Sequence, residues 1–220
     1  MTTLFGYDTE KSWDYENGFY ITSPITRLAK LCAHLELYTQ IAELPGHVVE
    51  LGVLKGASLI RFATFRNLYE SEHSRKIIGF DAFGKFPQQQ DEHDKEFIER
   101  FESSAGQGIS KEELESIFQL KGIGNIELIE GDILTTLPDY LHAHPELKIS
   151  LLHIDVDVYE PTKFALQHLY ERVVPNGIIV LDDYGTVAGE TKAVDEFFKD
   201  KDIDILKPSI SHIPSYIVKK

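Results

Sequence analysis

Short, nearly continuous apolar runs alternate along the chain with longer stretches of helical periodicity. Apolar residues from Leu28 to Leu44 recur at helical spacing, and Ser23-Pro24 before them predicts an N-cap serine with proline at the first helical position. The apolar runs are rich in Val and Ile and are bounded by Gly, Pro and Asp, which is typical of strands. The predicted strands cover residues 47–53, 76–83, 125–133, 149–158 and 177–184.

Helical stretches separate these strands, such as residues 161–173 and 190–199. This alternation favours a parallel sheet with crossover helices, and nearly continuous apolar strands are typical of a sheet that is covered on both faces. Residues 203–207 and 215–220 predict a terminal antiparallel pair. The sequence therefore predicts one Rossmann-like α/β domain over residues 1–220, with a mostly parallel seven-stranded sheet and helices on both faces.

The connection between the second and third strands, residues 84–124, is unusually long for a compact domain. It contains the charged run QQQDEHDKEFIER and a capping box formed by Ser110 and Glu113. Long connections are usually functional or mobile. We expect a helical lid over a ligand crevice, and a solvated surface insertion is the alternative.

Charge and cysteine content restrict the class of protein. The net charge of −14 opposes binding to nucleic acid and to anionic membranes, because both require a positive surface field. A single cysteine, Cys32, excludes an intrachain disulfide, and the polar N-terminal stretch is unlike a signal peptide. We expect a soluble, cytoplasmic protein with a small-molecule partner, and its oligomeric state stays open.

The carboxyl ends of parallel strands meet at one edge of the sheet, where open α/β folds bind ligands. The first predicted strand ends in a glycine-rich turn that starts at Glu50 and Gly52, without the three-glycine spacing of dinucleotide-binding loops. Because glycine has no Cβ, a cofactor could lie directly on the backbone at Gly52.

The next two strands also end in acids. Asp81 could accept hydrogen bonds from both ribose hydroxyls of an adenosine. Asp132 could accept from the adenine amino group, and Ile133 could pack on the ring. Capping of a turn or helix is the alternative for both acids.

Four acids stand at the ends of the last two predicted parallel strands: Asp155 and Asp157 on one, Asp182 and Asp183 on the other. Neighbouring strands lie about 4.8 Å apart, so these carboxylates would repel one another unless a hard cation such as Mg²⁺ compensated them. Strand alternation turns Asp182 and Asp183 to opposite sides, so not all four can be ligands in regular geometry. The alternative is that the acids cap helices or face water. His153, inside a predicted strand, is expected in the core.

Several segments together resemble a known family. VVELGVLKGAS, HIDVDVYEPTKFAL and PNGIIVLDDY, in this order, are similar to class I S-adenosylmethionine-dependent methyltransferases of the macrocin O-methyltransferase (TylF-like) family. The most specific parts are the acids Asp155 and Asp157 with Tyr159 and Thr162, and the Asp182-Asp183 pair. The resemblance implies methyl transfer to a hydroxyl of a deoxysugar, a nucleotide sugar or a glycosylated natural product.

The resemblance also implies site residues. It places a Mg²⁺ or similar divalent cation on Asp155, Asp182 and Asp183, with Asp155 as the catalytic base and Asp157 as the less favoured base. Together with the strand-end argument, it gives a cofactor-binding set of Ser23, Glu50, Gly52, Gly56, Ser58, Asp81, Asp132 and Ile133. The region near Ser23 and Arg27 would help to bind the methionine carboxylate.

In this interpretation the metal orients and acidifies the acceptor hydroxyl, and a carboxylate removes its proton. One alternative is a metal-dependent O-methyltransferase of a catechol-like molecule, although Val158 stands where catechol enzymes place a lysine. An NAD-binding nucleotide-sugar oxidoreductase is disfavoured by the missing third glycine and the absence of a Tyr-x-x-x-Lys pair. A noncatalytic binding module would not need the acidic cluster.

Overall fold

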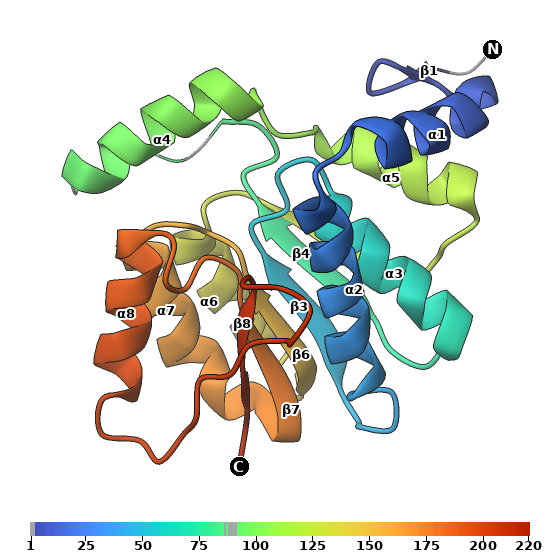
Figure 1. Ribbon diagram of the computed structural model, residues 1–220. Helices are drawn as coiled ribbons and strands as arrows, with labels where there is room; N and C mark the ends of the chain where they lie inside the picture. Colours follow the sequence, from blue (N-terminus) through green and yellow to red (C-terminus); the bar gives the residue numbers. More distant parts are fainter. Residues whose placement is uncertain (1–2, 86, 88–91) are drawn as a thin grey trace.

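A six-stranded sheet runs through the centre of the computed structural model, which describes residues 3–85, 87 and 92–220 (Figure 1). The first five strands across the sheet are parallel, and the last is antiparallel to its neighbour. Across the sheet, the order is β5 (Ile126–Glu130), β4 (Ile77–Asp81), β3 (His47–Leu51), β6 (Ile149–Ile154), β7 (Val173–Leu181) and β8 (Ser215–Val218). The direction of winding reverses between β3 and β6, which makes their carboxyl ends the topological switch point.

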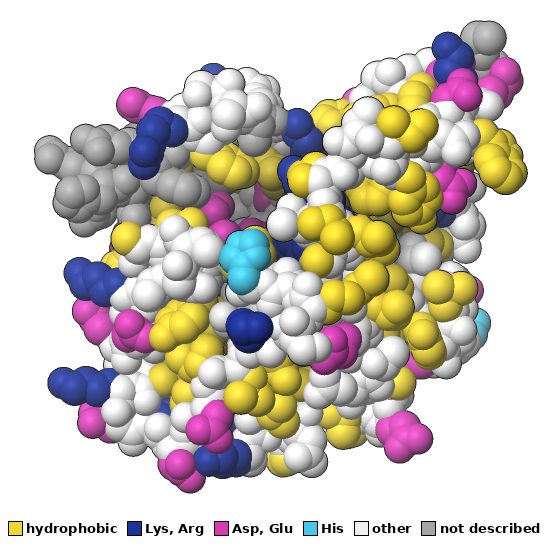
Figure 2. Space-filling view, viewed as in Figure 1, with side chains coloured by type: hydrophobic (Ala, Val, Ile, Leu, Met, Phe, Trp, Pro, Cys, Tyr) yellow, Lys and Arg dark blue, Asp and Glu magenta, His cyan; other side chains and the backbone are white. Residues whose placement is uncertain are grey.

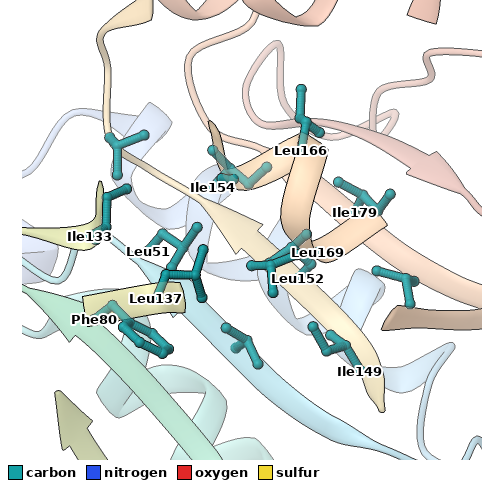
Figure 3. Packing of buried hydrophobic residues seen from close by; sticks show 14 of the residues in the cluster. Leu51, Phe80, Ile133, Leu137, Ile149, Leu152, Ile154, Leu166, Leu169 and Ile179 are labelled. Atoms are coloured by element: carbon teal, nitrogen blue, oxygen red, sulfur yellow. The ribbon is translucent and has the colours of Figure 1, made fainter. Parts of the chain in front are cut away.

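Helices cover both faces of the sheet, as predicted. One face packs against α2 (Ile25–Thr39), α3 (Ala57–Tyr69) and α5 (Lys111–Lys121). The other packs against α6 (Ile133–Ala143), α7 (Tyr159–Leu169) and α8 (Ala188–Phe198). Figure 3 shows this second layer, where Leu137 of α6 and Leu166 and Leu169 of α7 pack over the sheet. The α/β class and the mostly parallel sheet are therefore confirmed.

The strand count differs from the prediction at the carboxyl end of the chain. β8 pairs with β7, whereas the predicted partner segment, residues 203–207, contributes one isolated bridge between Leu206 and Tyr216. Within the described residues the main sheet therefore has six strands, not seven. The antiparallel edge of β7 already satisfies the backbone of β8, so a long hairpin partner is not needed.

The prediction of Ser23 as a helix N-cap is wrong. Ser23 instead ends a preceding helix, α1 (Ser12–Thr22), and donates its backbone N–H to the carbonyl of Phe19 at 2.9 Å. Pro24, in an extended conformation, then leads into α2.

The remaining elements are short. A small hairpin, β1 (Thr3–Leu4) and β2 (Tyr7–Asp8), and a 3₁₀ turn, η1 (Thr9–Lys11), lie upstream of α1. A second 3₁₀ turn, η2 (Tyr170–Arg172), precedes β7.

The long connection between β4 and β5 forms two helices, α4 (Glu92–Ala105) and α5. Ser110 caps α5 as predicted, because its side chain accepts a hydrogen bond from the backbone N–H of Glu113 at 3.2 Å. α5 buries Leu114 and Phe118 in the core, so it is part of the fold. α4 projects from the carboxyl edge of the sheet, and part of the charged run before it lies outside the described residues (Figure 1).

Within the part of the chain that the structure describes, no helix combines the length and apolar character that crossing a membrane requires.

Candidate active site

A cavity of about 760 Å³ opens at the carboxyl edge of the sheet, at the switch point between β3 and β6. Figure 2 shows the hollow between α4 and α2, with charged side chains around it. Its lining includes most of the predicted site residues, namely Gly52, Ser58, Asp81, Asp132, Ile133, Asp155, Asp182 and Asp183. Ser23, Glu50 and Gly56 are not among the residues that line it.

Gly52 is required by the backbone that faces it. Its backbone has a φ of 86°, and a Cβ at this position would lie 1.7 Å from the carbonyl oxygen of Asp155. The close approach of the chain after β6 therefore demands glycine here, and access for a cofactor at Gly52 stays a prediction. Gly56 also has a positive φ, 77°, at the N-cap of α3, where a Cβ would meet Leu114.

Asp81 organises the glycine loop. Its Oδ2 accepts hydrogen bonds from the backbone N–H groups of Val53 at 2.7 Å and Leu54 at 3.0 Å, and its Oδ1 accepts from that of Phe83 at 2.6 Å. The carboxylate also lines the cavity, and Oδ1 keeps a second lone pair. Asp81 therefore fixes the loop and faces the space where a ribose could lie.

Asp132 and Ile133 begin the next helix at the cavity wall. Asp132 caps α6, because its Oδ1 accepts a hydrogen bond from the backbone N–H of Leu134 at 2.9 Å. The capping alternative is thus present in the structure, and the same residue still lines the cavity. Ile133 is only 7% exposed and joins the core under the cavity.

A buried chain of charged groups crosses the sheet beneath the cavity. Glu50 accepts a hydrogen bond from Ser58 Oγ at 2.6 Å, and its Oε2 lies 3.6 Å from His153 Nδ1. The other ring nitrogen of His153, Nε2, lies 3.2 Å from Asp182 Oδ1. Burial alone would lower the pKa of His153, but Asp182 and Glu50 outweigh it and raise that pKa to about 10. His153 is in the core, as expected, and the two carboxylates beside it favour its protonated form.

Asp182 has a second cationic partner. Lys30 of α2 forms an ion pair with Asp182 Oδ2, and His34 Nε2 lies 3.8 Å from Oδ1. Burial would raise the pKa of Asp182, but its hydrogen bond to His153, the nearby His34 ring and the charge of Lys30 hold that pKa well below its usual range. Both carboxylate oxygens of Asp182 are therefore engaged inside the protein.

The remaining acids at this edge form a separate group. One oxygen each of Asp155, Asp157 and Asp183 lies within 4.8 Å of the others. Burial and the neighbouring carboxylates raise the pKa of Asp155 and of Asp157 well above the usual range. Three hard oxygen ligands at this spacing fit a divalent cation such as Mg²⁺. The structure thus joins Asp155 and Asp183, as predicted, and adds Asp157.

Basic side chains on α2 and α3 also line the cavity. Arg27 and Lys30 lie one turn apart on α2, and Arg61 lies one turn after Ser58 on α3. The sequence interpretation assigned no role to Lys30 or Arg61. The only signal for Lys30 is its i, i+3 spacing from Arg27, which is common on solvated helix faces, and Arg61 has no basic residue at that spacing before it.

The chain matches one protein family over most of its length. The profile of the macrocin-O-methyltransferase (TylF) family covers residues 20–217. The 8-demethyl-8-(2,3-dimethoxy-alpha-L-rhamnosyl)-tetracenomycin-C 4'-O-methyltransferase of Streptomyces olivaceus is 28% identical over 145 residues, which are 64% of this chain and 53% of that enzyme. The mycinamicin III 3''-O-methyltransferase of Micromonospora griseorubida is 27% identical over 146 residues, 64% of this chain and 56% of that enzyme. The match thus spans just over half the length of these curated relatives.

Solved structures have the same fold. The apo form of CalS11, a TDP-rhamnose 3'-O-methyltransferase, matches with a TM-score of 0.69 and 26% identity, covering 96% of this chain and 86% of that one. The O-methyltransferase NovP matches with a TM-score of 0.74 and 22% identity, covering 87% of this chain and 80% of that one, which shows the fold. Since the family profile covers almost the whole chain and the fold agrees, this protein belongs to the macrocin-O-methyltransferase (TylF) family.

Proposed function

We propose that the protein is an S-adenosylmethionine-dependent O-methyltransferase that methylates a sugar hydroxyl with the help of Mg²⁺ or a similar divalent cation. The observation that carries the proposal is the meeting of the Gly52 loop and the acidic cluster in one cavity at the switch point. Membership of the family supports it, as do the rhamnosyl compound and the TDP-rhamnose named for two of its relatives.

The cofactor would lie along the carboxyl ends of β3, β4 and β5. Asp81 would accept from the ribose hydroxyls, and Asp132 and Ile133 would border the adenine. Ser58 lines the same cavity and is anchored on the buried Glu50, so Glu50 would act from beneath the site. When bound, the cofactor supplies a methyl group already activated by a sulfonium charge, so the protein mainly has to position the acceptor.

The acceptor hydroxyl would lie on the β6–β7 side of the cavity. Asp155, Asp182 and Asp183, all of which line the cavity, would hold the cation, and the bound cation would orient and acidify the hydroxyl. Asp155 is the base that we propose, because it ends β6 directly beside the Gly52 loop, where the acceptor oxygen must meet the methyl group. The basic wall of Arg27 and Arg61 is compatible with an acceptor or cofactor group that carries negative charge.

A methyl-transfer screen with the whole chain tests the proposal. Purified protein, S-adenosylmethionine and panels of nucleotide sugars, glycosylated natural products and catechols would be compared with and without Mg²⁺, and the product S-adenosylhomocysteine measured. We expect turnover on a sugar hydroxyl that chelation abolishes and Mg²⁺ restores. Turnover on catechols alone would refute the assignment of a sugar acceptor. Full turnover in excess chelator would refute the requirement for a divalent cation.

A further inference from the structure

Helix α1 differs from the other α-helices around the sheet because it buries none of its residues. All of its residues except Gly18 and Phe19 are exposed. A helix of 11 residues is marginal in water by itself, and a glycine in its interior weakens it further. Helices in proteins gain most of their stability by packing an apolar face against other elements. The packing that the described residues give α1 is therefore small for a stable helix.

Exposed apolar side chains follow α1 and the start of α2. On α1, Trp13, Tyr20 and Ile21 have the spacing i, i+7 and i+8, which places them on one side of the helix. On α2, Ile25 and Leu28 are one turn apart. We call these five residues the apolar stripe; in chain order, they are 75%, 63%, 81%, 83% and 37% exposed. Figure 2 shows hydrophobic side chains gathered over α1 and the start of α2.

The exposed area of the apolar stripe matches one side of a protein interface. Aromatic side chains present about 150–250 Å² and aliphatic ones somewhat less, so the stripe exposes on the order of 600 Å². This value is at the upper end of the largest apolar patches on monomers, about 300–600 Å². An interface of standard size buries about 800 Å² on each partner, of which about 60% is apolar. The stripe alone therefore supplies the apolar area that such an interface needs.

The charges of α1 favour a second copy of this chain over a membrane as the partner of the stripe. α1 contains two acids, Asp14 and Glu16, and no lysine or arginine. Helices that lie on membranes are rich in basic residues, because lipid surfaces are commonly anionic. Twofold homodimers are by far the commonest oligomers, and they use the same patch on both copies. A twofold axis across the helices would run the two stripes antiparallel, which keeps the acids of one copy away from those of the other.

We propose that two copies of this chain pair around a twofold axis through the apolar stripe. The pairing would bury the side of α1 that a single copy leaves exposed. Each copy carries a net charge of −14, so long-range repulsion opposes the pairing. Salt screens this repulsion, so the dimer should become tighter as the salt concentration rises. The inference goes beyond the proposed function and is independent of it, because no residue of the stripe lines the cavity.

Sedimentation velocity of the whole chain over a range of concentrations measures the dimer directly. Ile21→Glu would place one carboxylate from each copy in the interface. Leu68→Glu is the matched control, because Leu68 is 72% exposed near the end of α3, outside the stripe, and the variant adds the same charge. We expect the wild type and Leu68→Glu to dimerise with Kd values within about threefold of each other, and Ile21→Glu to raise the Kd at least about thirtyfold.

Ile21→Glu could act by unwinding α1, so Ile25→Glu on α2 is a second variant and should weaken the dimer by a similar factor. Hydrogen exchange of the α1 amides should be slow in the dimer and fast in both variants. A wild type that stays monomeric up to about 0.1 mM would overturn the proposal, and its binding to phosphatidylcholine vesicles would then assign the stripe to a lipid surface. A dimer that both variants leave intact would place the interface elsewhere and would also overturn the proposal.

Discussion

At the scale of single residues, the backbone that faces the loop after β3 restricts which residue type that loop can contain. The space where a side chain would begin at Gly52 is filled by the Asp155 carbonyl oxygen. Gly185 has nearly the same φ, 82°, but no heavy atom lies within 4 Å of the position of its missing Cβ. The two glycines therefore separate the cost of a positive φ from the cost of a collision.

We expect Gly52→Ala to destabilise the protein far more than Gly185→Ala. The strained conformation alone should cost about 1–2 kcal/mol in both variants. The collision with backbone at Gly52 should raise the loss to at least about 3 kcal/mol, because β3 and β6 must move apart. Urea denaturation gives both free energies of unfolding. Equal losses would show that the approach of Asp155 does not determine this position.

At the scale of elements, the connection between β4 and β5 divides into two parts. α5 is anchored by Leu114 and Phe118 and belongs to the core. α4 reaches the rest of the protein at the cavity, where Phe101 and Ser104 contribute to the lining. Only α4 has the placement of a lid, so the predicted lid narrows to residues 92–105.

Limited proteolysis can test this lid. We expect early cleavage within residues 92–105 in the free protein, because an element with few core contacts opens locally at low cost. S-adenosylhomocysteine with a sugar acceptor should slow that cleavage, whereas cleavage at the turn of residues 70–75, away from the cavity, should not change. Fragments identified by mass spectrometry give both rates. The same rate at α4 with and without ligands would indicate a plain surface insertion.

At the scale of the whole molecule, the two edges of the sheet have different roles. The carboxyl edge carries the cavity and the acids, whereas the amino edge is held by a buried arginine, Arg75. Arg75 forms an ion pair with Glu70 at 2.9 Å and donates to Ser150 Oγ at 2.5 Å. It also donates to three carbonyls that follow α2, those of Ile41, Ala42 and Leu44.

Replacing this arginine should affect stability and spare the site. We expect Arg75→Met to lower the free energy of unfolding by about 3–5 kcal/mol, because Glu70 and several carbonyls lose a buried partner. The less buried Arg172→Met, which removes contacts to the carbonyls of His144 and Pro145, is the control and should cost about 1 kcal/mol. Calorimetric affinity for S-adenosylhomocysteine at low temperature should stay within about twofold of the wild type. A large loss of affinity in Arg75→Met would contradict the separation of the two edges.

The sequence alone determined the features that depend on local periodicity and on the ends of strands. The apolar runs predicted the parallel sheet, and the acids after them predicted Asp81, Asp132, Asp155 and Asp183 at one edge, all of which line the cavity. This works because buried strands need continuous apolar residues and parallel strands all end at the same side.

Only the tertiary structure decided which groups meet. Lys30 and Asp182 are 152 positions apart, and their contact depends on how α2 packs on the sheet. The charged state of His153 depends on Glu50 from one neighbouring strand and Asp182 from the end of the other. β6 ends at Ile154, and Asp157 has a φ of 63°, a turn that the strand predicted over residues 149–158 does not contain. Charge pairing is set by distances of a few ångströms between elements, and no spacing along the chain encodes those distances.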